Sequence, residues 1–152
     1  MYGLKQRMRG MTLTTAAAAL LVLLAVACGG EGGASVGTRP PVTGTDWTVD
    51  SVTVDGTAHP APARAHLKIQ DGRAAGSLGC NRFSATAQIT GDQIRLSHLR
   101  TTRMACDNAR MTFERALART LTAGPLTMTG EDGGLTLSTA GGDRVRLSGP
   151  PE

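Results

Sequence analysis

The chain has 152 residues, of which 40% are hydrophobic, 18% charged and 3% aromatic; this suits one globular domain and excludes a transmembrane bundle or a wholly disordered chain. The formal net charge is +4, but Lys5, Arg7 and Arg9 precede a continuous apolar run, and the remainder carries 13 positive against 12 negative charges. A net charge of +1 lacks the basic excess typical of nucleic-acid-binding proteins, so we expect no nucleic-acid partner.

The first 27 residues have the pattern of an export signal. Residues 1–9 are positively charged, and residues 16–27 form a 12-residue apolar stretch, shorter than the roughly 20 residues that a transmembrane helix needs. A glycine-rich segment begins directly after Cys28 and continues to a Pro-Pro pair at residues 40–41. We therefore predict a signal peptide over residues 1–27 and a flexible Gly/Pro linker over residues 28–44.

The end of this signal, Ala25-Val26-Ala27-Cys28, resembles a bacterial lipobox, in which lipid is attached to the Cys thiol and cleavage leaves that Cys as the mature N-terminus. Ala25 stands where lipoboxes usually have Leu. The alternative is ordinary secretion at an A-x-A site, with Cys28 as a free thiol. Each buried methylene of an acyl chain such as palmitate contributes about 0.8 kcal/mol, so two or more chains would hold the protein at the outer face of the cytoplasmic membrane.

Residues 45–149 alternate apolar and polar side chains in short segments separated by turns, which is typical of an antiparallel sheet with one solvent-facing side. The first strand region runs over residues 47–54, and hairpin turns are predicted at Asp71-Gly72 and Gly91-Asp92. After the second turn, Ile94, Leu96 and His98 should share one face. Further strands are expected around residues 126–128, 135–137 and 145–147.

Residues 107–121 interrupt the strand pattern. Met111, Phe113, Leu117 and Leu121 follow helical spacing, and Asp107 or Asn108 can cap the N-terminus, so we predict an amphipathic helix. Its arginines at 110, 115 and 119 should form a solvated face, and a basic partner-binding stripe is the alternative. The predicted fold class is therefore α+β, a small antiparallel β-barrel-like sheet of seven or eight short strands with one amphipathic helix.

The remaining cysteines, Cys80 and Cys106, form an even pair if Cys28 carries lipid. A disulfide between them in an oxidising compartment would contribute roughly 3 to 4 kcal/mol on the chain-entropy estimate. Two unlinked buried thiols are one alternative, and a metal site or a thiol nucleophile paired with His66 or His98 is another. Since the sequence shows no motif for a metal or catalytic site, we expect no metal and no cofactor.

Two motifs, residues 76–83 (GSLGCNRF) and 101–106 (TTRMAC), resemble the paired signatures of the META domain, the family that includes the heat-shock protein HslJ. The resemblance covers about residues 46–148 and includes the position of Trp47 near the domain start. Members often have Pro after the second Cys, where this chain has Asp107. The resemblance implies a compact β-rich domain, frequent on exported lipoproteins, linked to envelope stress and resistance, with no established catalytic activity.

Asn81, Arg82 and Arg103 lie close to the two cysteines in sequence and are candidates for binding. The two arginines could converge on an anionic ligand, or they could form ion pairs within the fold with carboxylates such as Asp107. Asn81 can instead bond backbone groups in a turn.

We therefore predict a non-catalytic, monomeric lipoprotein that binds an envelope partner and supports stress tolerance. A small-molecule or peptide carrier is the alternative, because a small barrel can hold a ligand between sheet and helix. A hydrolase or thiol enzyme is disfavoured, because the sequence has serines but no G-x-S-x-G, paired-acid or phosphate-loop motif.

Replacing Cys28 by Ser tests the lipid anchor. Without an acceptor thiol the protein should leave the membrane fraction, whereas the parent chain should stay in it, as measured by immunoblotting of fractionated cells. Ser35→Ala, a change in the same linker, is the matched control and should remain in the membrane fraction. A Cys28→Ser variant that still partitions entirely with membranes contradicts the prediction.

Overall fold

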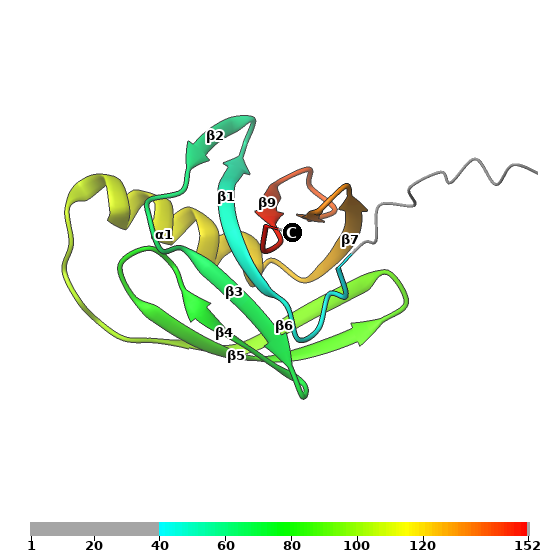
Figure 1. Ribbon diagram of the computed structural model, residues 1–152. Helices are drawn as coiled ribbons and strands as arrows, with labels where there is room; N and C mark the ends of the chain where they lie inside the picture. The colour runs from blue at the N-terminus through cyan, green and yellow to red at the C-terminus, as the bar shows by residue number, and fades with distance from the viewer. Residues whose placement is uncertain (1–39, 152) are drawn as a thin grey trace, which may run out of the picture. The chain divides into compact units, whose positions relative to one another are not determined.

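The computed structural model describes residues 40–151. The predicted signal peptide, Cys28 and linker residues 28–39 lie outside the described residues. Within the described range the chain forms nine strands and one helix (Figure 1). In chain order these are β1 (Asp46–Val54), β2 (Thr57–Pro60), β3 (His66–Gln70), β4 (Arg73–Ser77), β5 (Arg82–Thr90), β6 (Gln93–Thr101), α1 (Asn108–Leu121), β7 (Pro125–Glu131), β8 (Gly134–Ser138) and β9 (Arg144–Ser148).

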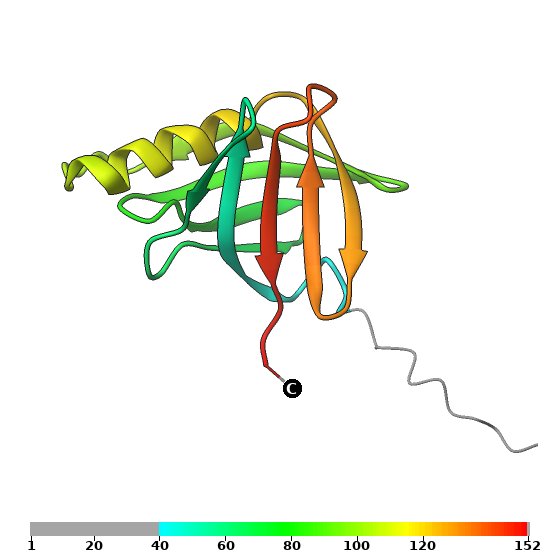
Figure 2. The ribbon, with the colours of Figure 1, turned by 90° about the horizontal axis from the view of Figure 1, so that it is seen from above.

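Eight of the strands form a closed antiparallel barrel. The order runs from β1 through β3 to β9, and β9 pairs back with β1, where Thr48 lies opposite Ser148. The remaining strand, β2, folds back on the second half of β1, so that Val54 lies opposite Thr57. Figures 1 and 2 show this closed arrangement with α1 beside β1 and β2. The predicted fold class is confirmed, with one strand more than the seven or eight expected.

Local turn chemistry sets the register of the hairpins. Asp55-Gly56 and Asp71-Gly72 each have positive φ at both residues, 50° and 77° in the first pair and 51° and 71° in the second. Glycine adopts this conformation most readily, and among the other residues Asp and Asn do so most often. An Asp-Gly pair can therefore connect two antiparallel strands through a two-residue turn. The turn predicted at Asp71-Gly72 is therefore confirmed, as is the one at Gly91-Asp92, where Thr90 lies opposite Gln93.

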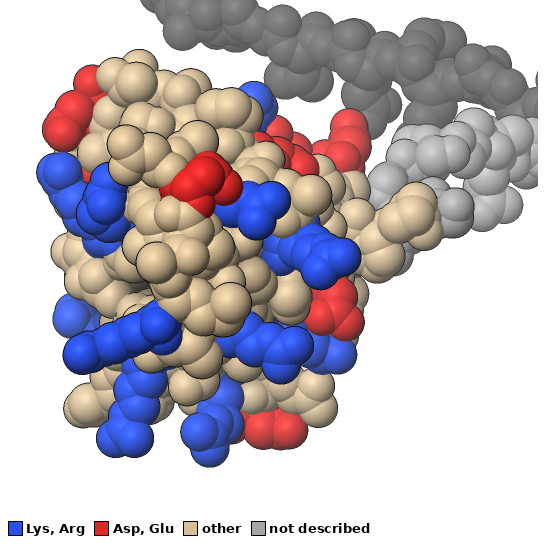
Figure 3. Space-filling view, turned by 90° about the vertical axis from the view of Figure 1, so that its left-hand side faces the viewer, with Lys and Arg blue, Asp and Glu red and all other residues tan. Residues whose placement is uncertain are grey.

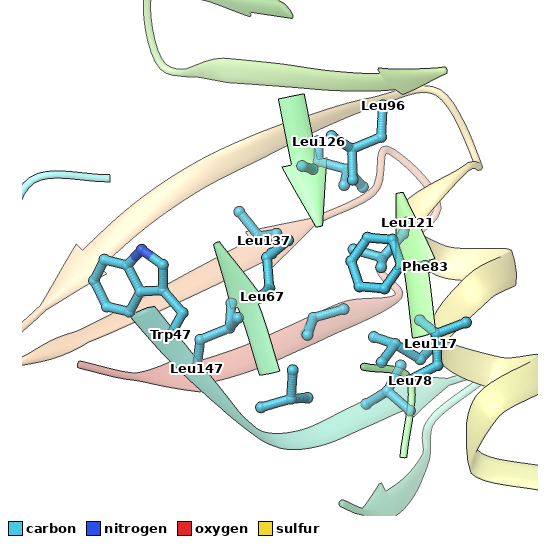
Figure 4. Close-up of a cluster of buried hydrophobic side chains, with 14 of the residues drawn as sticks. Trp47, Leu67, Leu78, Phe83, Leu96, Leu117, Leu121, Leu126, Leu137 and Leu147 are labelled. Atoms are coloured by element: carbon cyan, nitrogen blue, oxygen red, sulfur yellow. The ribbon is translucent and has the colours of Figure 1, made fainter. Parts of the chain in front are cut away.

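The barrel interior is filled by alternate side chains of the strands, because residues two apart face the same side of a sheet. Leu117 and Leu121 of α1 extend toward Phe83 and Leu78, so the helix closes one end of the core, while Trp47 lies at the other end (Figure 4). Other fully buried strand residues include Leu67, Ile69, Ile94, Leu126, Leu137 and Val145, each no more than 1% exposed.

The chain enters the barrel at the end away from α1. The Gly44 backbone N–H donates to the carbonyl of Ile69, next to the β3–β4 turn. The Trp47 indole N–H donates to the Val42 carbonyl at 3.1 Å. The C-terminal end is close by, because a Cβ built on Gly149 would lie 3.3 Å from the Pro40 ring.

The prediction that His98 shares a face with Ile94 and Leu96 is wrong. Ile94 and Leu96 are buried, but His98 is exposed. The register between β5 and β6 shifts here, and His98 has a φ of 54°. Such a bulge adds one residue to a strand and reverses its alternation, so Leu99 instead packs against the core.

The helix begins where the sequence predicts. Asp107 is the N-cap, and its carboxylate accepts a hydrogen bond from the Arg110 backbone N–H at 3.0 Å. The buried face of α1 contains Phe113, Leu117 and Leu121 as expected, together with two polar residues, Glu114 and Thr120. No helix within residues 40–151 has the length and apolar character required to cross a bilayer.

Gly76 allows β3 and β4 to approach closely. A Cβ at this position would lie 2.0 Å from the backbone oxygen of His66. Gly76→Ala should therefore lower the free energy of unfolding by about 2–3 kcal/mol, because the clash is with backbone that cannot move aside. Denaturant unfolding followed by fluorescence of Trp47, the only tryptophan, measures the change.

Gly141→Ala is the matched control. A Cβ there would meet only the Thr139 hydroxyl, at 3.8 Å, and the change should stay within about 0.5 kcal/mol. Equal stability of the two variants would contradict the close approach of β3 and β4.

Candidate functional site

The two family-like motifs meet at one end of the barrel and are joined there covalently. Cys80, in the turn after β4, and Cys106, just before α1, form a disulfide with their Cα atoms 6.1 Å apart. The predicted pairing is therefore present, and the alternative of two unlinked thiols does not apply to this structure. The bond ties the β4–β5 turn to the segment between β6 and α1.

Asn81, next to Cys80, is buried to 98% and uses its whole side chain for hydrogen bonds inside the protein. Its amide nitrogen donates to Glu114 Oε1 at 2.7 Å and to the Met104 carbonyl at 3.2 Å. Its amide oxygen accepts from the Thr102 hydroxyl at 2.9 Å and from the Met104 N–H at 2.7 Å. Two donors and two lone pairs are the full capacity of an Asn side chain, so Asn81 holds the fold together and has no free group for a ligand.

Glu114 completes this arrangement from the helix. Its second carboxylate oxygen, Oε2, accepts from the Asn81 backbone N–H at 2.8 Å, and the residue is only 8% exposed. Both oxygens therefore accept hydrogen bonds, as a buried carboxylate requires. We call Asn81, Thr102, Met104 and Glu114 the Asn81 hub.

Glu114 is a buried residue of α1 that the sequence analysis did not select. Its spacing of three and seven residues from Leu117 and Leu121 could have identified it, because an acidic residue at that spacing lies on the buried face and needs a partner.

The hub also fixes the backbone of Arg82. The Thr102 hydroxyl accepts from the Arg82 N–H at 3.1 Å, and the Thr102 N–H donates to the Arg82 carbonyl at 3.0 Å. The Arg82 side chain itself points to solvent at the start of β5. Arg82 is therefore an exposed charge on a backbone that the hub holds in place.

The structure brings Arg82 together with two arginines that were not among the predicted site residues. A surface hollow of about 560 Å³ beside the disulfide is lined by Arg64, Arg82 and Arg110, with His66 and Ser77. Arg103 is exposed but does not line the hollow, so Arg82 and Arg103 do not converge there. Arg64 reaches the hollow from the β2–β3 loop, and no local sequence pattern links it to Arg82.

Neither Arg82 nor Arg103 forms an ion pair within residues 40–151. Asp107, the carboxylate expected to neutralise one of them, instead pairs with Arg110, with its Oδ2 3.3 Å from Arg110 Nε. Among the described residues no group of three or more His, Cys, Asp or Glu is arranged to hold a metal ion.

Charge is distributed unevenly around the barrel. Residues 61–110, which supply β3 to β6, carry eight Lys or Arg against three Asp, whereas the other described residues carry four against seven. Because β3 to β6 are consecutive in the barrel, one half of its surface is basic. Figure 3 shows the side where α1 begins, with Lys and Arg gathered over the lower half, which Figure 1 places over these strands.

Removing the Asn81 side chain should be strongly destabilising. Asn81→Ala leaves the buried Oε1 of Glu114 and the part-buried Met104 N–H without these partners, while Oε2 of Glu114 keeps the backbone N–H of residue 81, and we expect a loss of about 3 kcal/mol in the free energy of unfolding. Glu114→Gln keeps the shape but places an N–H group opposite one of the two donors, and it should cost about 1–2 kcal/mol. Urea unfolding measures both values.

Glu131→Gln is the control for loss of a carboxylate. The Glu131 side chain is 62% exposed and its oxygen is 3.8 Å from Arg146, so the change should stay within about 0.5 kcal/mol. An Asn81→Ala variant as stable as this control would show that the hub contributes nothing.

Comparisons with known proteins agree with this geometry. Two solved structures share the fold: an NMR structure of a protein from Burkholderia xenovorans (TM-score 0.61, 21% identity, 73% of this chain and 85% of that chain) and a second NMR structure (TM-score 0.52, 20% identity, 67% and 86%). A comparison with curated proteins finds no match. The family model of the META domain matches residues 40–151, which include the disulfide and the whole Asn81 hub, and the chain therefore belongs to the META domain family.

Proposed function

We propose that this protein is a non-catalytic lipoprotein, held through Cys28 at the outer face of the cytoplasmic membrane, whose META domain binds an envelope partner and so supports tolerance of envelope stress. The observation that carries the proposal is the division, at the two motifs, between polar groups that bond within the fold and a charged group that faces solvent. Their buried polar groups are engaged in the Asn81 hub, while Arg82 beside them is exposed and free of ion pairs within residues 40–151.

This division suits binding more than chemistry. A catalytic acid, base or nucleophile must be able to touch a substrate, whereas Asn81 and Glu114 are buried and bond each other. A binding surface gains affinity when its residues are fixed beforehand, since less conformational entropy is lost on association. The hub and the disulfide supply that rigidity directly beneath Arg82.

The disulfide supports the predicted route of export. Disulfides persist in oxidising compartments and are rare in the bacterial cytosol. The signal peptide predicted over residues 1–27 would bring the domain to such a compartment. The two lines of support are independent, because one comes from the N-terminal sequence and the other from the geometry of residues 80 and 106.

The carrier alternative finds less support. A carrier barrel needs internal space for its ligand. Here the inside of the barrel is occupied by packed apolar side chains, with Trp47 at one end and Leu117 and Leu121 of the helix at the other (Figure 4). The hollow at Arg82 lies on the outside of the barrel.

Gene deletion tests the proposed function. Cells without the protein should survive heat and cell-wall antibiotics less well than the parent strain, and the parent chain should restore survival. The Cys28→Ser chain, which lacks the anchor but keeps the domain, should not restore it. Photo-crosslinking from position 103, near the hollow but not in its lining, should capture an envelope component in intact cells.

Glu131→Gln, on the acidic side of the barrel, is the matched complementation control and should restore survival fully. Equal survival of deletion and parent strains under each stress, together with no crosslinked component, would contradict the proposal.

A further inference from the structure

We propose that the hollow beside the disulfide binds a phosphate-bearing ligand through the guanidinium groups of Arg64, Arg82 and Arg110. The inference rests on the proposed function, because it identifies the ligand as a component of the cell envelope. It goes further in naming the chemistry that the domain recognises and the residues that recognise it.

Three separate elements deliver the arginines to one place. Arg82 begins β5 and is fixed through its backbone by Thr102. Arg110 lies in the first turn of α1. Arg64 belongs to the loop between β2 and β3, and its carbonyl is 3.0 Å from Nδ1 of His66, which also lines the hollow. Convergence of like charges from distant parts of the chain is unfavourable unless an anion offsets it.

The backbone of Arg64 adds a second observation. Its φ is 78°, in the left-handed region that residues with a side chain seldom adopt. Glycine would adopt this conformation without cost, yet an arginine occupies the position. Unfavourable backbone conformations of this kind concentrate at functional sites, where the side chain is needed.

Within the described part of the chain, two of the three arginines around the hollow lack a compensating carboxylate. No Asp or Glu is among its lining residues, and within residues 40–151 neither Arg64 nor Arg82 has an ion-pair partner. Arg110 shares its charge with Asp107, but its side chain is still 52% exposed. The hollow therefore offers at least two free guanidinium groups.

This arrangement suits phosphate better than a carboxylate. The planar donor fork of Arg matches the oxygens of either group, but phosphate presents more oxygens in more directions and carries more charge. Arginine N–H groups that approach from different elements can therefore all donate to one phosphate group. The volume, about 560 Å³, exceeds that of a single phosphate, so the group that carries the phosphate also has room.

A second basic hollow lies further along β5 and shares no lining residue with the first. Arg82, Ser84 and Thr86 alternate on the outer side of this strand, since Phe83 and Ala85 between them are buried. Ser84 and Thr86 line a hollow of about 450 Å³ together with Arg73, His98 and Arg100. The positive field of this half of the barrel should draw anionic ligands toward the site.

Calorimetric titration of the full chain in a neutral detergent tests the proposal. The probes are inorganic phosphate, glycerol phosphate, and micelles containing phosphatidylglycerol against micelles of phosphatidylcholine, all at one ionic strength. Arg82→Gln and Arg64→Gln should each weaken binding about tenfold, because each removes charge-assisted hydrogen bonds to the phosphate. Arg64→Gly is a second variant, compatible with the left-handed backbone, and should weaken binding equally.

Two arginines serve as matched controls. Arg95 lies in β6 on the same basic half but outside both hollows, and Arg144 begins β9 as Arg82 begins β5. Arg95→Gln and Arg144→Gln should change affinity less than about twofold. Thermal unfolding of every variant shows that each one is folded.

The outcomes separate the sources of the phosphate. Binding of glycerol phosphate and not of phosphatidylglycerol micelles supports the site with a soluble ligand, and the reverse supports it with a lipid headgroup. Absence of binding in all arms overturns the proposal, as does equal weakening by Arg95→Gln and Arg82→Gln, which would indicate diffuse attraction. Because the titration does not require lipid on Cys28, the site can stand even if the anchor or the stress role fails.

Discussion

The carboxylate of Glu114 and the amide of Asn81 are the pair on which the arrangement of this end of the molecule depends. Each buried polar group must keep a partner, since an unsatisfied one costs more free energy than a hydrogen bond contributes. The helix therefore cannot slide or rotate over the barrel without leaving Glu114 or Asn81 unpaired. A hydrophobic contact would tolerate such movement, because it has no direction.

The disulfide and the Asn81 hub restrain the same two segments by different physics. The Cys80–Cys106 bond acts mainly by limiting the unfolded chain, whereas the hub acts in the folded state through directed hydrogen bonds. On reduction of the bond, the hydrogen bonds of the hub would still hold the Arg82 backbone to Thr102. The segments that carry Arg82 and Arg110 are therefore restrained twice, at the point where two loops and a helix meet.

Features that depend on neighbouring residues were accessible from the sequence, and features that depend on distant ones were not. The Asp71-Gly72 turn, the cap at Asp107 and the alternation in β5 follow from local chemistry, and these placed the elements correctly. The bulge at His98 carries no turn signature, so the period of two was extended too far. Arg64 meets Arg82 only because the barrel closes, and that relation has no trace in the local pattern.

The closure of the barrel by β1 and β9 has one more consequence. Since Thr48 lies opposite Ser148 and Pro40 lies against Gly149, the two ends of the domain are adjacent, at the end of the barrel remote from the helix. A short peptide could link them, and the chain could be reopened at another turn, giving a circular permutant with the same strand order. Reporter proteins fused at either end would likewise leave the arginine-lined hollow accessible.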